Sequence, residues 1–391
     1  MPDGEGMLGR GAHESATSPD FVTVNPSTTA AGHRPSSGRP TSLGIEIVRS
    51  LEELRPDWTR LAAASGNVFA TWEWAATWWA HYGRGRPLAI AALTRPDGTV
   101  AGIVPMYRFA SRPLAVGRLI GHGPADQQGP ICAPEDLSEV SHAIMAAVAA
   151  AGLTVVALER LQADIDWQGM LGGRSFASEP SPVMSLTARS WDELLAGWSA
   201  KRRGKMRRIE RRLEREHGHA YVMTTDAGSL ARDLDVMFEL HRARWGPQSE
   251  FLAAQSFHRD FARTALERGW LRMWRLEIDG RAIAAHHGFR FAHAESAYQN
   301  GRLPGWEDYE VARALWLHTI RVALESGATE YRFLRGDEPY KARFATHDDG
   351  IVSIGVGRGA AGRALVATAD RVARSPVRRT LRRVLRTRDG E

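Results

Sequence analysis

Cysteine is almost absent from this 391-residue chain, because Cys132 is the only one. A lone cysteine excludes an internal disulfide and a cysteine-based zinc site, so we expect Cys132 to be a small core residue. Apolar runs of about 18 residues, the length that a membrane-spanning helix needs, are also absent. His286 and His287 adjoin in an expected strand, where successive side chains point to opposite faces. They cannot share one metal ion, and we expect a protein without a metal.

The first 44 residues are rich in glycine, serine, threonine and proline. They lack the basic start followed by an apolar stretch that marks a signal peptide. This composition predicts a disordered leader over residues 1–44 and a cytoplasmic location.

Positive charge is concentrated in two segments. Residues 201–216 hold nine basic residues against three glutamates, and residues 358–391 hold ten arginines against three acidic residues. The whole chain carries only +6, so the remainder is mildly acidic. Neither segment has a helix-turn-helix or zinc-finger frame, which argues against sequence-specific DNA binding. The Arg-rich tail, with its interspersed leucine and valine, predicts peripheral contact with an anionic membrane.

One pattern occurs twice along the chain. Two strand-like runs, LAIAALTRPDGTVAGIVPMYRF from Leu88 and LRMWRLEIDGRAIAAHHGFRF from Leu271, each contain an Asp-Gly turn and predict hairpins. An amphipathic helix precedes each hairpin, and a further helix and strand follow it. A repeat of this length indicates a duplicated domain of α/β (α+β) class.

The repeat divides the chain. Residues 191–216 look helical, with Met206, Ile209 and Leu213 forming one narrow apolar stripe. We expect the Arg-rich tail to form an amphipathic helix after the Ser375-Pro376 break. The predicted organisation is a leader (1–44), an N-terminal domain (45–190), a basic linking helix (191–223), a C-terminal domain (224–357) and a tail (358–391).

Ionisable residues gather where the strand expected over 330–334 ends, in ATEYRFLRGDEPYKARFATH. Acyl transfer to an amine or hydroxyl needs a proton acceptor and positive charge near the developing oxyanion. Asp337 could be the acceptor, Lys341 the charge and Tyr340 a donor or proton relay. The alternative is a solvated loop whose charges pair with one another. The substrate-binding candidates of this segment are Arg335 and Arg343.

A polar loop, GHGPADQQGP from Gly121, follows the corresponding strand of the first half. It could be a simple Gly/Pro turn. If the two halves face each other, however, His122, Asp126 and Gln127 would lie opposite Asp337 and Lys341 and form an acceptor site.

The succession of these pieces resembles known acyltransferases. The order of helix, hairpin, strand, helix and strand is similar to the GNAT fold, and its duplication resembles the tandem-GNAT arrangement of Fem-type peptidyl transferases. More closely, FATWEWAATWWAHYG, GTVAGIVPMYR, LIGHGPADQQGP and FLRGDEPYKARFAT resemble the CelD-type group. The resemblance implies an N- or O-acyltransferase that moves an acyl group from acetyl-CoA or another acyl-CoA to a sugar-containing, envelope or exopolysaccharide precursor. Fem-type enzymes carry a functional lysine in a place comparable to Lys341.

The same resemblance places the acyl-CoA site at NGRLPGWEDYEVARALW and implies Asn300, Gly301 and Arg313 as cofactor-binding residues. GNAT enzymes usually bind the CoA pyrophosphate with a Gly-rich turn at the start of this helix. Here the expected helix start near Tyr309 has acidic residues and no glycine, which disfavours phosphate. Two alternatives therefore stay open: a Fem-like transferase that uses aminoacyl-tRNA, and a non-catalytic accessory protein of polysaccharide assembly.

Overall fold

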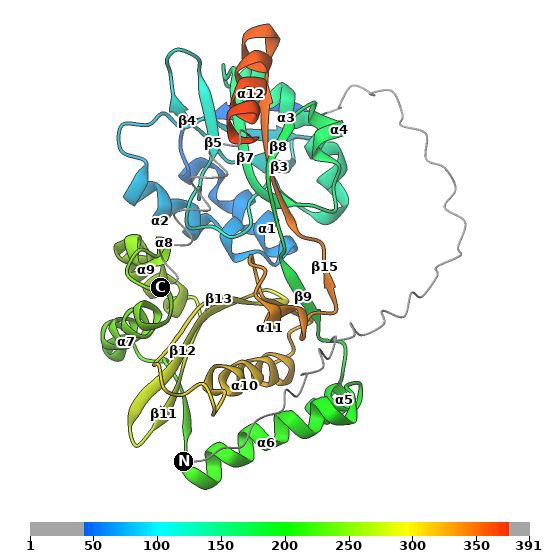
Figure 1. Cartoon of the computed structure of the whole chain (residues 1–391). Coiled ribbons are helices and arrows are strands. Elements are labelled where there is room, and N and C mark those ends of the chain that lie inside the picture. Colours follow the sequence, from blue (N-terminus) through cyan, green and yellow to red (C-terminus); the bar gives the residue numbers. More distant parts are fainter. Residues whose placement is uncertain (1–42, 375–391) are drawn as a thin grey trace, which may run out of the picture. The chain divides into compact units, whose positions relative to one another are not determined.

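The computed structural model of the chain describes residues 43–374. Residues 1–42 of the predicted leader and residues 375–391 of the predicted tail lie outside the described residues. No helix in the described part is long and apolar enough to cross a membrane. Figure 1 shows the elements in chain order. The strands are β1 (Gly44–Val48), β2 (Ile90–Thr94), β3 (Val100–Val104), β4 (Met106–Ala110), β5 (Val116–Leu119), β6 (Ile131–Cys132), β7 (Val155–Gln162), β8 (Arg174–Glu179), β9 (Pro182–Ser185), β10 (Ala220–Met223), β11 (Leu271–Ile278), β12 (Arg281–Phe291), β13 (Ala294–Arg302), β14 (Glu330–Arg332), β15 (His347–Asp348) and β16 (Ile351–Gly357). The helices are α1 (Arg55–Ser65), α2 (Trp72–Tyr82), α3 (Leu137–Ala150), α4 (Trp167–Leu171), α5 (Trp191–Ala196), α6 (Ala200–Glu216), α7 (Ala227–Trp245), α8 (Glu250–Ala253), α9 (Gln255–Glu267), α10 (Val311–Glu325), α11 (Pro339–Ala342) and α12 (Gly359–Arg374).

Both predicted hairpins form, and each continues into the predicted helix and strand. In the first half, β2 pairs antiparallel with β3, and β5 pairs parallel with β7 after the crossover through α3. In the second half, β11 pairs antiparallel with β12, and β13 pairs parallel with β14 after the crossover through α10. The two halves thus share one order of elements, which confirms the predicted tandem α/β fold.

Proline changes the sheet of the first half. Pro105 separates β3 from β4, and these strands belong to two different sheets, β1-β2-β3-β6 and β4-β5-β7-β16-β8. Proline has no N–H to donate to a ladder, so pairing is interrupted where it stands. The second half has no such break in β12, and its sheet runs β10-β11-β12-β13-β14-β9-β15.

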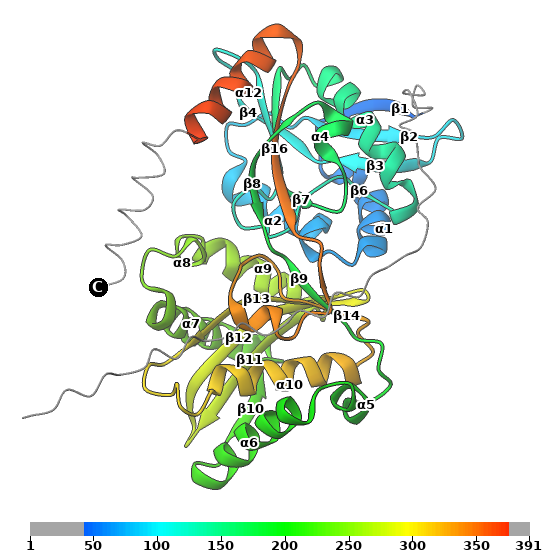
Figure 2. The ribbon, with the colours of Figure 1, turned by 45° about the vertical axis from the view of Figure 1, so that its right-hand side comes forward.

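Two strands cross between the sheets. β8 pairs with β16 in the five-stranded sheet, but after two residues the chain continues as β9 and pairs with β14 and β15 in the seven-stranded sheet. β15 and β16 return in the opposite direction and pair with them (Figure 2). The predicted boundaries at residues 190 and 357 therefore divide the sequence but not the sheets.

The core joins the two halves. Trp74 of α2 is fully buried and packs edge-on against Phe257 and Phe261 of α9, with ring centroids 4.9 and 4.6 Å apart. Burial of an aromatic side chain of this size is worth a few kcal/mol, about 1.5–3 for Phe-sized groups. The halves are therefore held together by apolar packing as well as by strands.

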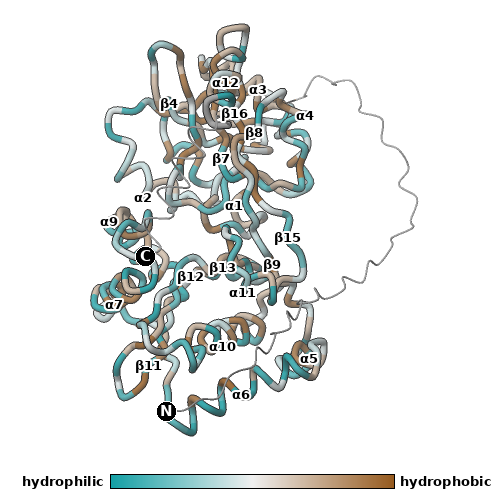
Figure 3. The backbone as a smooth tube through the Cα atoms, in the orientation of Figure 1, coloured by the Kyte–Doolittle hydropathy of each residue, from teal (hydrophilic) through white to brown (hydrophobic). Residues whose placement is uncertain are grey.

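Several local predictions need correction. The helix expected over 191–216 is broken into α5 and α6 at Gly197, and Ser199 caps α6 by accepting from the Arg202 N–H. The stripe of Met206, Ile209 and Leu213 is buried, as predicted, whereas most of α6 is hydrophilic (Figure 3). Within the described part of the tail, α12 packs on β16 and β8, whereas the helix predicted after Ser375 falls on residues outside the described part.

Candidate active site

The seven-stranded sheet splits between its neighbouring strands β13 and β14. These strands pair only at Ala294, Glu295 and Ser296 on β13. β13 continues to Arg302, whereas β14 ends at Arg332, two residues earlier than the sequence predicted. Leu334 follows with φ of 57°, a left-handed conformation that turns the chain away from the sheet. From Ala297 onward, β13 therefore pairs with no strand of the described chain on its β14 side, and we call this its free edge.

A cavity of about 790 Å³ lies at this opening. Its wall includes residues of both halves, and this is the size range of ligand sites. Six of the residues singled out in the sequence line it together: His122, Asp126, Asn300, Arg335, Tyr340 and Lys341. The two loops expected to face each other thus meet at one cavity, while the roles assigned to their residues stay predictions.

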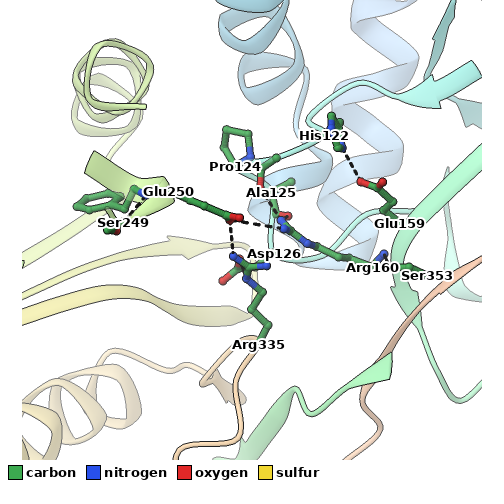
Figure 4. A network of polar contacts seen from close by, with 12 residues as sticks. His122, Pro124, Ala125, Asp126, Glu159, Arg160, Ser249, Glu250, Arg335 and Ser353 are labelled. Carbon is green, nitrogen blue, oxygen red and sulfur yellow. Dashed lines mark hydrogen bonds and ion pairs between the residues drawn. The ribbon is translucent and has the colours of Figure 1, made fainter. Parts of the chain in front are cut away.

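An ionic network joins the halves at this cavity (Figure 4). Arg335 Nε lies 2.9 Å from Asp126 Oδ1, and Arg335 Nη2 lies 2.9 Å from Glu250 Oε2. Arg160 Nη2 is 4.0 Å from the same Glu250 oxygen. Burial raises the pKa of Asp126, although the charges of Arg335, Arg160 and Lys341 act in the opposite direction. The network fixes the position of the His122–Asp126 loop relative to the strand exit of the second half.

Arg160 holds the loop over residues 122–126 through hydrogen bonds to its backbone. Its guanidinium donates to the carbonyl oxygens of Gly123 and Ala125, and its own N–H donates to Ser353 Oγ at 3.0 Å. Arg160 has φ of 56°, and a non-glycine residue in this region is held there by its surroundings. The residue was not predicted, because its partner Ser353 comes from β16, nearly two hundred positions along the chain.

His122 has a carboxylate partner that the sequence did not reveal. Its Nδ1 lies 2.5 Å from Glu159 Oε2, and its Nε2 contacts Arg118 Nη1. Burial would raise the pKa of Glu159, but the hydrogen bond and charge of His122 and the charge of Arg118 outweigh it and lower the pKa. A carboxylate that stays ionised orients the imidazole ring, as in acid–base dyads.

The DEPYK segment forms the other side of the cavity. Lys341 is buried, pairs with Glu338 Oε2 at 2.9 Å and donates to the Arg335 carbonyl oxygen at 2.5 Å. Burial raises the pKa of Tyr340 to about 12, so its phenol stays protonated at neutral pH and can donate. Tyr340 also lies 3.5 Å from Asn300 Nδ2. One cation and one hydroxyl donor therefore meet at the splayed strands.

Three predicted site residues do not reach this cavity. Asp337 and Arg343 are exposed and are not part of its wall. Asp337 lies in the turn before α11, which directs it outward, so the proton-acceptor assignment is not supported by its position. Gln127 lines a different cavity of about 440 Å³, where its carbonyl oxygen accepts from Asn67 Nδ2 at 3.4 Å.

The predicted cofactor residues separate as well. Asn300 lines the cavity. Gly301 packs against α7, where an added Cβ would lie 2.3 Å from the backbone nitrogen of His241. Arg313 lines a smaller neighbouring cavity and pairs with Glu310 at 2.5 Å. Glu310, in a left-handed conformation, is the N-cap residue of α10, which begins at Val311, two residues after the predicted start near Tyr309. A carboxylate thus stands where GNAT enzymes usually hold phosphate.

The described residues 43–374 hold no cluster of histidine, cysteine or acidic side chains that could bind a metal. The ring of His286 lies beside Trp316 of α10, whereas the ring of His287 lies beside Phe251 and Phe289 on the other side of the sheet. Opposite orientations of the two rings follow from the pleat, as expected.

Comparison with known proteins agrees with this architecture. Residues 200–342 match the family model described as an acetyltransferase (GNAT) domain. No curated protein sequence matches the chain. Among solved structures, FemX is similar with a TM-score of 0.58 at 12% identity, covering 80% of this chain and 97% of that one. The C-terminal domain of a putative lysylphosphatidylglycerol synthetase from Agrobacterium fabrum gives a TM-score of 0.51 at 12% identity, covering 83% and 96%.

At such identities the structural matches show a shared fold, and the activity class rests on the domain match. The CelD-type resemblance is not confirmed beyond this level. The chain thus has a tandem GNAT-like fold, and its residues 200–342 match a GNAT acetyltransferase domain, which supports an acyltransferase.

Proposed function

We propose that the cavity between β13 and β14 transfers an acyl group from a thioester donor, acyl-CoA, to an amine or hydroxyl. One observation carries this proposal: the strands diverge into a cavity of about 790 Å³ whose wall holds a protonated phenol and a buried ammonium, those of Tyr340 and Lys341. Acyl transfer requires donors aimed at a developing negative charge.

The free edge of β13 offers the donor its binding surface. Residues 297–302 pair with β12 on one side and, among the described residues, with no strand on the other, although the Asn300 carbonyl oxygen accepts from the His241 and Trp245 side chains. An extended ligand that contains amide groups can add to such an edge through backbone hydrogen bonds. The arm of CoA has this chemistry, so its thioester would lie near Tyr340.

The reaction then needs one proton removed and one supplied. The nucleophile loses its proton as its new bond to the acyl carbon forms, and the thiolate leaves as the carbon–sulfur bond breaks. We assign His122, oriented by Glu159, as the proton acceptor in place of the exposed Asp337, with Nε2 taking the proton once the nucleophile replaces Arg118 there. Tyr340 would protonate the thiolate, and Lys341 would stabilise charge on the acyl oxygen.

The acceptor would enter from the first half. Trp78, Tyr82 and Phe109 line this end of the cavity together with Arg86 and Arg118. Arg86 makes no ion pair among the described residues, and Arg118 stacks on Phe109 at 4.3 Å. Aromatic faces beside guanidinium groups suit a sugar that carries negative charge. We therefore retain a sugar-containing envelope or exopolysaccharide precursor as the acceptor.

A second donor, aminoacyl-tRNA, is favoured by one observation. Helix α6 presents Lys201, Arg207, Arg208 and Arg211 as exposed side chains that form no ion pair with an acidic residue in the described part of the chain. Unneutralised cations on one helix suit a polyanion. The same helix reaches the start of α10 through Lys205 and Glu310, 3.0 Å apart.

Thermal unfolding in the presence of each donor tests the proposal. A ligand at 100 times its dissociation constant stabilises the folded state by about 2.7 kcal/mol. We expect stabilisation of this size with acyl-CoA, together with slower hydrogen exchange of the backbone amides of residues 297–302. Stabilisation by charged tRNA alone would support the second donor, and stabilisation by neither would contradict both.

A further inference from the structure

A second cavity, of about 230 Å³, adjoins the reaction cavity at the start of α10. Trp316 and Tyr340 belong to the walls of both cavities. The smaller one has three guanidinium groups in its wall, those of Arg244, Arg302 and Arg313, and two carboxylates, those of Glu307 and Glu310. Fully ionised, this set carries one excess positive charge.

The two carboxylates neutralise only two of the three arginines. Glu307 pairs with Arg302, and Glu310 pairs with Arg313 and also with Lys205. Arg244 forms no ion pair with a carboxylate anywhere in residues 43–374. The excess charge therefore resides on Arg244.

Arg244 is held in place by neutral groups. Its Nη1 donates to Asn300 Oδ1 at 2.7 Å, and its guanidinium lies 4.6 Å from the Trp245 ring centroid and 5.8 Å from that of Tyr340. Burial lowers the pKa of Arg244 and the charge of Arg302 acts in the same direction, whereas Tyr340 and Glu338 act against them. A guanidinium presents five N–H donors in a fixed fork, so several donors remain for a ligand.

From this geometry we infer that Arg244 binds a phosphate group of the acyl donor in the smaller cavity. This site would bind phosphate in place of the missing Gly-rich turn. The acidic Glu310 is the N-cap residue of α10 and disfavours a phosphate at the start of that helix. Arg244 contacts Asn300, which stands on the free edge of β13, and Tyr340, which faces the reaction cavity. A donor held at Arg244 by its phosphate would thus extend along β13 toward Lys341. The inference rests on the proposed donor site but names a residue and a ligand chemistry for it.

Calorimetric binding to wild type and to Arg244→Gln tests the inference with three probes: CoA, inorganic pyrophosphate and a short single-stranded RNA. The matched control is Arg242→Gln, because Arg242 is exposed on the same helix and lies outside both cavity walls. Hydrogen bonds to charged groups contribute about 1.5–3 kcal/mol. We therefore expect the dissociation constants of CoA and pyrophosphate to be about 10- to 150-fold larger for Arg244→Gln than for wild type. Arg244→Lys, which keeps the positive charge, should lose less affinity than Arg244→Gln. Near-wild-type affinity of Arg242→Gln is expected.

The probes separate the possible failures. Weakened binding of CoA and pyrophosphate by Arg244→Gln supports the inference together with the CoA donor. Weakened binding of pyrophosphate and RNA, with no CoA binding by wild type, supports the phosphate site but contradicts acyl-CoA as the donor. Equal affinities of wild type and a well-folded Arg244→Gln overturn the inference and leave the proposed reaction standing. Absence of binding to all three probes by wild type overturns the inference.

Discussion

Replacing Lys341 with methionine removes one positive charge from the reaction cavity and keeps most of the apolar stem. The Lys341 side chain is 7% exposed, so its ammonium acts in a poorly solvated place. A preorganised group that stabilises the oxyanion is worth about 10² to 10³ in turnover. We expect a loss of this size in Lys341→Met.

The same change has a structural cost that must be separated from catalysis. It leaves Glu338 without its partner at 2.9 Å and the Arg335 carbonyl oxygen without a donor. Leaving a buried group unpaired costs about 1–3 kcal/mol of stability. Adding Glu338→Gln removes the unpaired carboxylate, so the double variant should regain stability but not turnover.

Release of free CoA, detected with a thiol reagent, provides the assay. The protein itself adds little background, because Cys132 is buried and burial raises the pKa of its thiol to about 12. Near-normal turnover in a folded Lys341→Met protein would refute the assigned role of Lys341 in stabilising the acyl oxygen. Recovery of turnover in the double variant would show that Lys341 acts only through Glu338.

Three further predictions concern stability. Burial lowers the pKa of His286 and of His287 to about 3, below the unfolded value of about 6.5, so their contribution is complete above pH 6.5 and falls as the pH drops. Together they should lower the free energy of unfolding by about 4 kcal/mol between pH 8 and pH 5, which urea titrations of wild type and single glutamine variants would check. Asp126→Asn and Arg335→Gln should show a coupling energy of about 0.5–3 kcal/mol in a double-mutant cycle, and simple additivity would argue against the pair. Gly301→Ala should cost about 1–3 kcal/mol or more in thermal unfolding, because its Cβ would meet backbone atoms of α7; an unchanged melting temperature would contradict this packing.

Local patterns in the sequence predicted most of the fold. The Asp-Gly turns at Gly98 and Gly280, both with positive φ, formed where expected, and the apolar spacing of Met206, Ile209 and Leu213 identified the buried face of α6. Such features depend on residues close together in the chain. The exchange of β9 and β16 between the sheets depends on long-range pairing, which the order of the elements does not encode.

The site was predicted in part for the same reason. Tyr340 and Lys341 stand in a conspicuous segment, and His122 and Asp126 stand in the matching loop of the other half. Glu159, Arg160 and Arg244 lie in ordinary strand or helix contexts, and only tertiary contacts distinguish them. Asp337 lies outside the cavity wall, because sequence proximity to Lys341 does not determine which way a turn directs each side chain.

The most direct test of the central claim is mass-spectrometric detection of acyl transfer. Wild-type protein would be incubated with isotopically labelled acetyl-CoA and a panel of amino sugars and sugar phosphates, beside a folded Tyr340→Phe, Lys341→Met variant. We expect label on an amine or hydroxyl of at least one acceptor with wild type, and at least about a hundredfold less label with the variant. Equal labelling by both proteins would contradict the assignment of the reaction to this cavity.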